Sequence, residues 1–171
     1  MKTTLISPTF ELESKFREML QDWNFNNEEP SPWTIDLDTS DFEKYINKLI
    51  DASNGIGLEG LLVPHSSFWL IDENQNILAT SNIRQTLNDK LWVTGGHIGY
   101  GVTPCARRKG FATKILELTL LEAEKLGIDK ALVTCSKRNL GSAKSILKNG
   151  GELWKETPMK NRITQYYWIH L

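Results

Sequence analysis

Apolar positions along the chain recur with two different periods, one typical of helices and one typical of strands. Apolar residues at helical spacing predict helices over residues 10–23, from a cap at Thr39 or Ser40 to Leu49, from Gly110 to Gly127, and over residues 139–149. Short apolar or alternating runs predict strands at residues 68–71, 77–84, 91–102, 130–135 and 165–171. Residues 24–33, with two prolines and three asparagines, predict a loop.

The order of these elements places two helices before a hairpin, and a strand–helix–strand crossover in the second half of the chain. Such an order is typical of an α/β or α+β domain. A length of 171 residues, with 40% hydrophobic and 24% charged residues, fits a single globular domain over residues 1–171.

The composition also disfavours nucleic acid, membranes and metal ions as partners. With a net charge of -1, the chain has no global attraction for nucleic acid or for an anionic membrane. It has no apolar run near the ~18 residues of a membrane span, and its N-terminus does not resemble a signal peptide. Cys105 and Cys135 have no metal-ligand spacing to the histidines, so we expect no metal site. We therefore expect a cytoplasmic protein with reduced thiols.

The most informative stretch joins the glycine-rich strand at residues 91–102 to the helix that begins at Gly110. Arg107, Arg108 and Lys109 crowd the start of that helix, where the helix dipole disfavours cations by roughly 0.3–1 kcal/mol each. Two explanations stay open: a chance surface cluster, or an anion site in which helix N–H groups and cations bind a pyrophosphate. The sequence has no G-x-x-x-x-G-K-[ST] motif, and Pro104 interrupts a dinucleotide G-x-G-x-x-G motif.

Two motifs in this part of the chain resemble those of a known family. The run V-x-P-x-x-R-x-x-G-x-A at residues 102–112 resembles the acetyl-CoA motif R/Q-x-x-G-x-G/A of the GCN5-related N-acetyltransferase (GNAT) superfamily. The run N-x-x-S at residues 139–142, followed by Gly150, resembles the next segment of that superfamily. From about Phe68 to the C-terminus, the sequence also resembles a bacterial subgroup usually called predicted acetyltransferases.

The resemblance implies a mixed, twisted central sheet with helices on both faces and splayed central strands. It implies acetyl-CoA as co-substrate, with residues 66–171 forming the sheet and its binding core and residues 1–65 shaping the acceptor pocket. The implied activity is direct acetyl transfer to a primary amine of a small molecule or peptide, and a homodimer is compatible with the superfamily. Acetyl-CoA would contact Tyr100, Gly101, Val102, Arg107, Arg108, Lys109, Gly110, Phe111, Ala112, Thr113, Asn139 and Ser142.

The sequence departs from the family pattern at both of its usual catalytic positions. The usual tyrosine, seven residues after Asn139, is Ile146 here, and the usual glutamate falls near Gly96. His97, a residue type with an ordinary pKa of about 6.5, and Tyr100 are the candidate catalytic replacements. Each also suits a structural role, the histidine as a hydrogen-bonded side chain and the tyrosine as a packed aromatic ring.

Several other positions keep two interpretations. Arg84 either holds an acidic group of the acceptor or is a surface arginine, and Cys135 would act only in a different, covalent mechanism. Trp33, Trp69 and Trp92 either line a pocket or pack in the core. At the level of function, an N-acetyltransferase competes with a non-catalytic acyl-CoA sensor, whereas the net charge of -1 disfavours a nucleic-acid binder.

Overall fold

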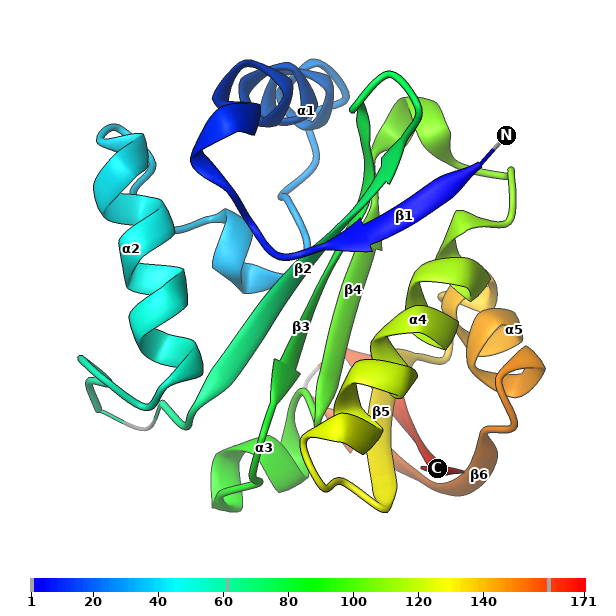
Figure 1. Ribbon diagram of the computed structural model, residues 1–171. Helices are drawn as coiled ribbons and strands as arrows, with labels where there is room; N and C mark the ends of the chain where they lie inside the picture. The colour runs from blue at the N-terminus through cyan, green and yellow to red at the C-terminus, as the bar shows by residue number, and fades with distance from the viewer. Residues whose placement is uncertain (1, 61, 160) are drawn as a thin grey trace.

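The computed structural model describes residues 2–60, 62–159 and 161–171, which form a seven-stranded mixed sheet with helices on both faces (Figure 1). The strands follow the order β1-β2-β3-β4-β5-β7-β6 across the sheet. Their bounds are β1 Thr3–Ile6, β2 His65–Asp72, β3 Ile77–Arg84, β4 Ile98–Val102, β5 Lys130–Ser136, β6 Glu152–Met159 and β7 Arg162–His170. The helices are α1 Glu13–Phe25, α2 Phe42–Ser53, α3 Asp89–Val93, α4 Phe111–Lys125 and α5 Leu140–Lys148, with short turns of 3-10 helix at η1 Phe10–Leu12, η2 Trp33–Ile35 and η3 Pro104–Ala106.

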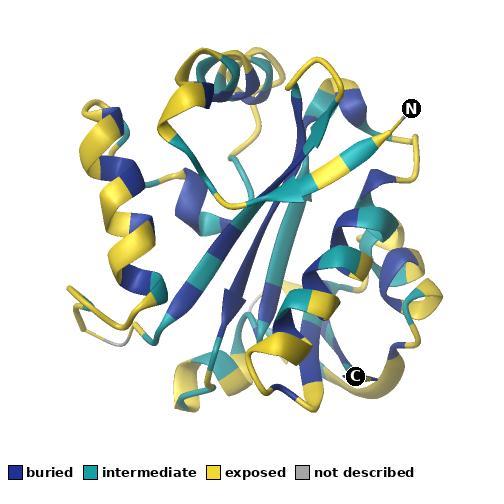
Figure 2. Cartoon of the chain, viewed as in Figure 1, coloured by how far each residue is buried: buried dark blue, intermediate teal, exposed yellow. Residues whose placement is uncertain are grey.

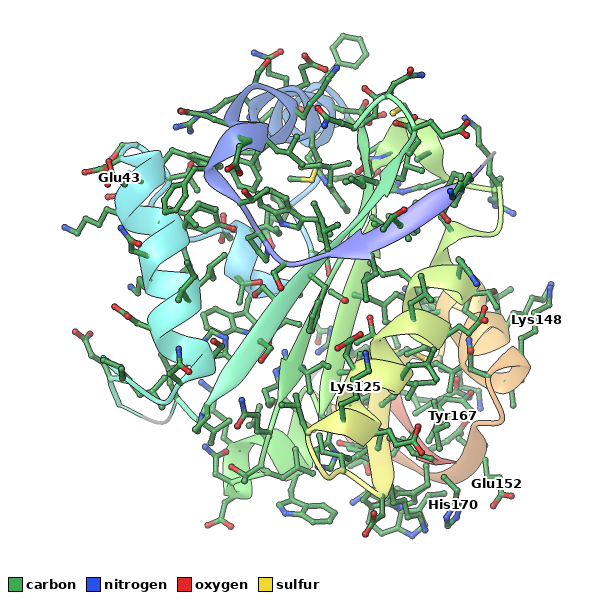
Figure 3. All side chains as sticks on the ribbon, in the orientation of Figure 1. Glu43, Lys125, Lys148, Glu152, Tyr167 and His170 are labelled. Atoms are coloured by element: carbon green, nitrogen blue, oxygen red, sulfur yellow. The ribbon has the colours of Figure 1, made fainter. Side chains whose placement is uncertain are left out.

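The two faces of the sheet carry separate cores (Figure 2). Trp69 of β2 packs into the core beneath α1 and α2, whereas the next residue, Leu70, packs with Phe111 and Ile115 at α4. Because successive side chains of a strand point to opposite faces, the first two helices cover one face and α4 covers the other. A further part of the α4 and α5 core lies over β5 and β7 and contains Tyr167, which is labelled in Figure 3.

The predicted hairpin is confirmed, and its turn is held by one aspartate. Asp72 Oδ1 accepts hydrogen bonds from the backbone N–H groups of Asn74 and Asn76, at 2.9 and 2.8 Å. Gln75 takes a left-handed conformation with φ 62°, which lets the chain reverse direction. Such an Asx turn gives the backbone its own local hydrogen-bond acceptor, so β2 and β3 pair in register from His65↔Arg84 onward.

The central strands β4 and β5 splay apart, as the family resemblance implied. They run parallel and pair in the sheet register at Ile98↔Val133, with one further isolated bridge at Gly96↔Val133. By contrast, β5 pairs with β7 along its whole length, from Lys130 to Ser136. The free edges of β4 and β5 beyond Ile98 therefore face each other across a gap in the hydrogen-bonded ladder.

The predicted strand at residues 91–102 is wrong in its first half. Residues Asp89–Val93 form the short helix α3, because the Asn88 side chain accepts a hydrogen bond from Leu91 N and caps the helix. Gly95 and Gly96 follow with φ 110° and 64°, which are left-handed values incompatible with a continuing strand. The true strand begins only at Ile98.

Two smaller differences concern the N-terminal part of the chain. The cap of α2 is Asp41, whose carboxylate accepts a hydrogen bond from Lys44 N, rather than Thr39 or Ser40. The four residues of β1 were not predicted as a strand, although they pair with β2 at one edge of the sheet. The first 65 residues therefore contribute a strand to the sheet as well as the helices α1 and α2.

Candidate functional site

The turn that leads into α4 is built to present backbone N–H groups. Arg108 and Gly110 both take left-handed conformations, with φ 63° and 88°, and Gly110 caps the helix without any side-chain hydrogen bond. A Cβ atom added at Gly110 would meet no heavy atom within 4 Å, so the space in front of the helix is open. Successive N–H groups in such a turn, added to the helix dipole, favour an anion.

The three cations at this turn are not equivalent. Arg107 makes a two-pronged ion pair with Glu28, at 2.7 and 2.6 Å, and its guanidinium lies 5.1 Å from the centre of the Trp23 ring. This hydrogen bond lowers the pKa of Glu28. Lys109 Nζ donates to the Cys105 carbonyl at 3.2 Å, and Arg108 is exposed and contacts no acidic group among the described residues. The protein therefore balances one of the three charges itself and leaves the other two at the turn.

The residues after Gly110 divide between the turn and the core. Phe111 is buried beneath α4, whereas Ala112 and Thr113 are half-buried. Thr113 Oγ1 donates to Ser145 Oγ at 3.3 Å, which ties the start of α4 to α5. The backbone N–H groups of Phe111 and Ala112 precede the first helical hydrogen bond, which Thr113 N makes to Gly110. These two residues can therefore contribute to the anion site through their main chain.

The edge of β4 that faces the splay carries N–H and C=O groups that make few hydrogen bonds to other strands. Thr103 N donates to Leu78 O at 3.0 Å and Arg84 N donates to His97 O at 2.8 Å, so the odd-numbered positions of β4 point toward β3. By alternation, the N–H and C=O groups of Tyr100 and Val102 point toward β5. Two side chains reach them: Ser31 Oγ donates to Tyr100 O at 3.3 Å, and Arg107 Nε donates to Val102 O at 3.2 Å.

The opposite wall of the splay is the start of α5. Asn139 Oδ1 accepts a hydrogen bond from Ser142 N at 3.0 Å, so this amide caps α5. Ser142 Oγ lies 2.9 Å from the hydroxyl of Tyr100, which also donates to Ser142 O at 3.3 Å. Burial raises the pKa of Tyr100 to about 12, so the phenol is protonated at neutral pH. A proton donor therefore lies between β4 and α5, while Ile146 is fully buried in the core.

His97 and Cys135 do not have the properties of catalytic groups here. The Nδ1 atom of His97 accepts a hydrogen bond from Leu132 N at 2.9 Å, so its proton sits on Nε2. Burial and the charge of Arg84 lower the pKa of His97 to about 4. The neutral ring thus has no free lone pair with which to accept a proton, and its geometry supports the structural role. Burial likewise raises the pKa of Cys135, which keeps it a thiol.

The face of the sheet opposite α4 carries a buried polar row that the sequence did not single out. Thr80, Asn82 and Arg84 of β3 share this face with His65 of β2. Arg84 is only 7% exposed, which corrects its interpretation as a surface arginine. The spacing of Thr80, Asn82 and Arg84 at every second residue of a predicted strand was the signal that could have identified the row, although Ser81 is polar as well.

Trp33, Trp69 and Trp92 differ in burial and in their contacts. Trp69 is fully buried in the core, whereas Trp92 on α3 is 42% exposed and lies edge-on to Trp168 at 5.7 Å. Trp33 is half-buried and meets the His65 ring edge-on at 5.1 Å, on the same face of the sheet as Arg84. Trp33 thus lies beside the His65 end of the polar row, and Trp69 lies beside Thr80 at the other end, within the core.

Among the described residues, no group of three or more histidine, cysteine or acidic side chains could hold a metal ion. In the same part of the chain, no helix is both long and apolar enough to span a membrane.

Comparisons with known proteins agree on one family. A family model described as an acetyltransferase (GNAT) domain matches residues 5–152. The fold is similar to that of a ribosomal-protein-S5-alanine acetyltransferase from Vibrio fischeri, with a TM-score of 0.75 and 13% identity over 99% of this chain and 93% of that one. It is also similar to the microcin C7 self-immunity acetyltransferase MccE, solved in complex with acetyl-CoA and AMP (TM-score 0.68, 17% identity, 99% and 93% covered).

A third similar structure is a dodecameric spermidine N-acetyltransferase from Vibrio cholerae, with a TM-score of 0.65 and 15% identity over 98% of this chain and 93% of that one. At these identities the likeness concerns the fold. No curated protein matches the sequence.

Proposed function

The chain belongs to the GNAT family of acetyltransferases, and on that premise we propose that it transfers an acetyl group from acetyl-CoA to the primary amine of a small molecule or peptide. The observation that carries this proposal is the coincidence of two features. Strands β4 and β5 part after Ile98 and Val133, and the open anion-binding turn at Gly110 lies directly after β4.

The residues at the splay fit the parts of acetyl-CoA. The N–H groups around Arg108 to Ala112, with the charges of Arg108 and Lys109, suit a pyrophosphate. The main-chain groups of Tyr100 and Val102 suit the amides of a pantetheine arm, in the way that a sheet edge takes up an extended peptide. Asn139 contributes by capping α5, which sets the position of that wall. The side chain of Arg107 is paired with Glu28, so its contribution is to hold the turn in place.

Acetyl-CoA supplies a thioester whose carbonyl carbon a neutral amine can attack, releasing acetylated amine and CoA thiol. Tyr100 is the residue that we expect to give the departing sulfur its proton, because its pKa of about 12 keeps the hydroxyl protonated and it faces the splay. His97 lacks a free lone pair, so we expect the amine to lose its proton to water. The rate should therefore rise with pH until the acceptor amine is neutral.

A second candidate function is a non-catalytic acyl-CoA sensor. Two observations favour it: Ile146 occupies the position of the usual acid, and the Nδ1 atom of His97 already accepts a hydrogen bond from the backbone of Leu132.

A cytoplasmic location and a homodimer stay predictions.

Release of free thiol separates the two functions. The purified protein would be given acetyl-CoA with a panel of amines, and thiol would be measured colorimetrically while mass spectrometry detects acetylated product. An acetyltransferase releases thiol above the rate without amine and yields one acetylated product per thiol. Binding of acetyl-CoA without thiol release for any amine would establish the sensor instead.

A further inference from the structure

Arg84 is a buried cation with no acidic partner among the described residues. It ends β3 and is 7% exposed. Its hydrogen bonds to described residues run from Nη1 to the carbonyls of Gly95 and Gly96, and both are long, at 3.4 Å. The Nε atom is buried and has no acceptor among the described residues. A guanidinium offers five N–H donors in a planar fork, so most of the hydrogen-bonding capacity of Arg84 is unused.

No side chain in the described part of the chain provides a charge that compensates Arg84. The charge of Arg84, together with burial, lowers the pKa values of His65 and His97 to about 4, so both histidines are neutral. Burial lowers the pKa of Arg84 to about 10, so it stays charged at neutral pH. A desolvated charge without a partner is strongly unfavourable. A buried group that is perturbed in this way is a candidate for a functional site.

Gly95 and Gly99 leave the room that the guanidinium of Arg84 occupies. A Cβ atom at Gly99 would lie 3.2 Å from Arg84 Nη2 and 3.3 Å from Nη1, and one at Gly95 would lie 3.8 Å from Cζ. Both glycines are half-buried rather than buried. A Cβ atom at Gly99 would also meet Pro32 Cβ at 3.4 Å, so a larger residue there would displace the guanidinium, and its position beside β4 depends on this glycine.

Arg84 lies close to the point at which β4 and β5 separate. Gly99 pairs with Asn82 on β3 and directly follows Ile98, the last residue at which β4 pairs with β5. Tyr100 points to the α5 side of the sheet, so Gly99 and Arg84 lie on the opposite face. An anion held by Arg84 would therefore sit beside the vertex of the splay, on the face away from the Tyr100 hydroxyl.

We propose that Arg84 binds a carboxylate of the acceptor, so that the acceptor is an amino acid or another amine that carries a carboxylate near the reacting nitrogen. The planar fork of an arginine matches a carboxylate through two parallel hydrogen bonds. Binding the carboxylate at the vertex places the amine of the same molecule near the thioester. The inference rests on the proposed acetyltransferase function and names the class of its acceptor.

The test compares matched acceptors that differ in one charge. Each common L-amino acid would be paired with its carboxamide, and kcat/KM for thiol release would be measured with the wild type, Arg84→Gln and Arg84→Lys. The ratio between amino acid and carboxamide should fall at least ~30-fold in Arg84→Gln, with Arg84→Lys in between, because a buried group that pairs with a substrate discriminates strongly. The affinity for acetyl-CoA, measured by calorimetry, should be unchanged in both variants.

A binding readout keeps the inference testable if Arg84→Gln does not fold or if no amine is acetylated. The Arg84 Nε–H signal in the NMR spectrum of the wild type, assigned by its loss in Arg84→Lys, should shift with N-acetylglycine and not with N-acetylglycinamide. A shift with neither compound, or an unchanged ratio of kcat/KM in a folded Arg84→Gln protein, would overturn the assignment. Acetylation of amines without a carboxylate preference would overturn it while leaving the acetyltransferase function intact. Failure of acetyl-CoA to bind would overturn the proposed function itself.

Discussion

Replacing Arg84 by methionine should make the protein without substrate more stable. Burial lowers the pKa of Arg84 from its ordinary value to about 10, and at 1.36 kcal/mol per pKa unit this shift corresponds to about 3 kcal/mol of lost solvation. The substitution removes two hydrogen bonds of 3.4 Å, whose length makes them worth at most ~1 kcal/mol each. Methionine has a similar length and no charge to desolvate. The net expectation is a gain of roughly 1–3 kcal/mol.

Thermal and urea unfolding followed by circular dichroism at pH 7.5 would measure the change. At roughly 2–4 °C per kcal/mol for a domain of this size, Tm should rise by about 2–12 °C. Arg17→Met is the matched control, because Arg17 donates to Thr39 Oγ1 at 3.2 Å and pairs with Glu13 at 3.1 Å. That variant should lose up to ~1 kcal/mol. A fall in Tm for Arg84→Met as large as for Arg17→Met would refute the argument that Arg84 lacks compensation in the free protein.

Three further predictions address pH, catalysis and packing. His65 and His97 have pKa values of about 4 in the folded protein against about 6.5 unfolded, so the unfolded chain binds more protons between those values. The free energy of unfolding should therefore be highest above pH 6.5 and should fall by up to ~1.4 kcal/mol per pH unit for each histidine as the pH drops toward 4. A urea midpoint that does not change over this pH range would contradict the prediction. Tyr100→Phe should lower kcat about 100-fold with little change in acetyl-CoA affinity, and an unchanged kcat would exclude this hydroxyl as the acid. Gly101→Ala should lower the free energy of unfolding by about 1–3 kcal/mol, because the added Cβ would collide with Ser31 O. The control Gly141→Ala should not destabilise the protein, because the nearest atom to its Cβ, Asn139 Oδ1, lies 3.7 Å away. Equal urea midpoints for the two variants would refute the collision.

Local signals explain which parts of the fold could be predicted from the sequence. Strand β3 was predicted with its observed bounds, because an apolar run begins at Ile77 directly after the polar turn at residues 72–76. The strand predicted at residues 91–102 was wrong in its first half. Leu91, Trp92 and Val93 are apolar enough for a strand, but the Asn88 cap makes them helical. An asparagine three residues before an apolar run is a weak signal by itself, and only its hydrogen bond to Leu91 N shows which alternative forms.

The candidate site divides in the same way. The turn at Gly110 could be predicted, since glycine after a cationic run at a helix start has a local physical meaning. The pairing of Arg107 with Glu28 joins residues 79 positions apart and depends on how α1 packs against the turn, so no local pattern could reveal it. The burial of Arg84 is tertiary too. The alternation in β3 shows which face the side chain takes, but not that glycines and neutral histidines surround it.

The central claim is that acetyl-CoA binds with its phosphates at the Gly110 turn. Isothermal titration of acetyl-CoA into the wild type, Gly110→Asn and Gly110→Asp tests it most directly. Asparagine and aspartate are similar in shape and both tolerate the left-handed conformation, so the two variants differ mainly by one negative charge in the open space before α4. We predict micromolar binding by the wild type, a modest loss in Gly110→Asn, and a further loss of about 30-fold or more in Gly110→Asp. Equal affinities of the two variants, or no binding by the wild type, would contradict the account.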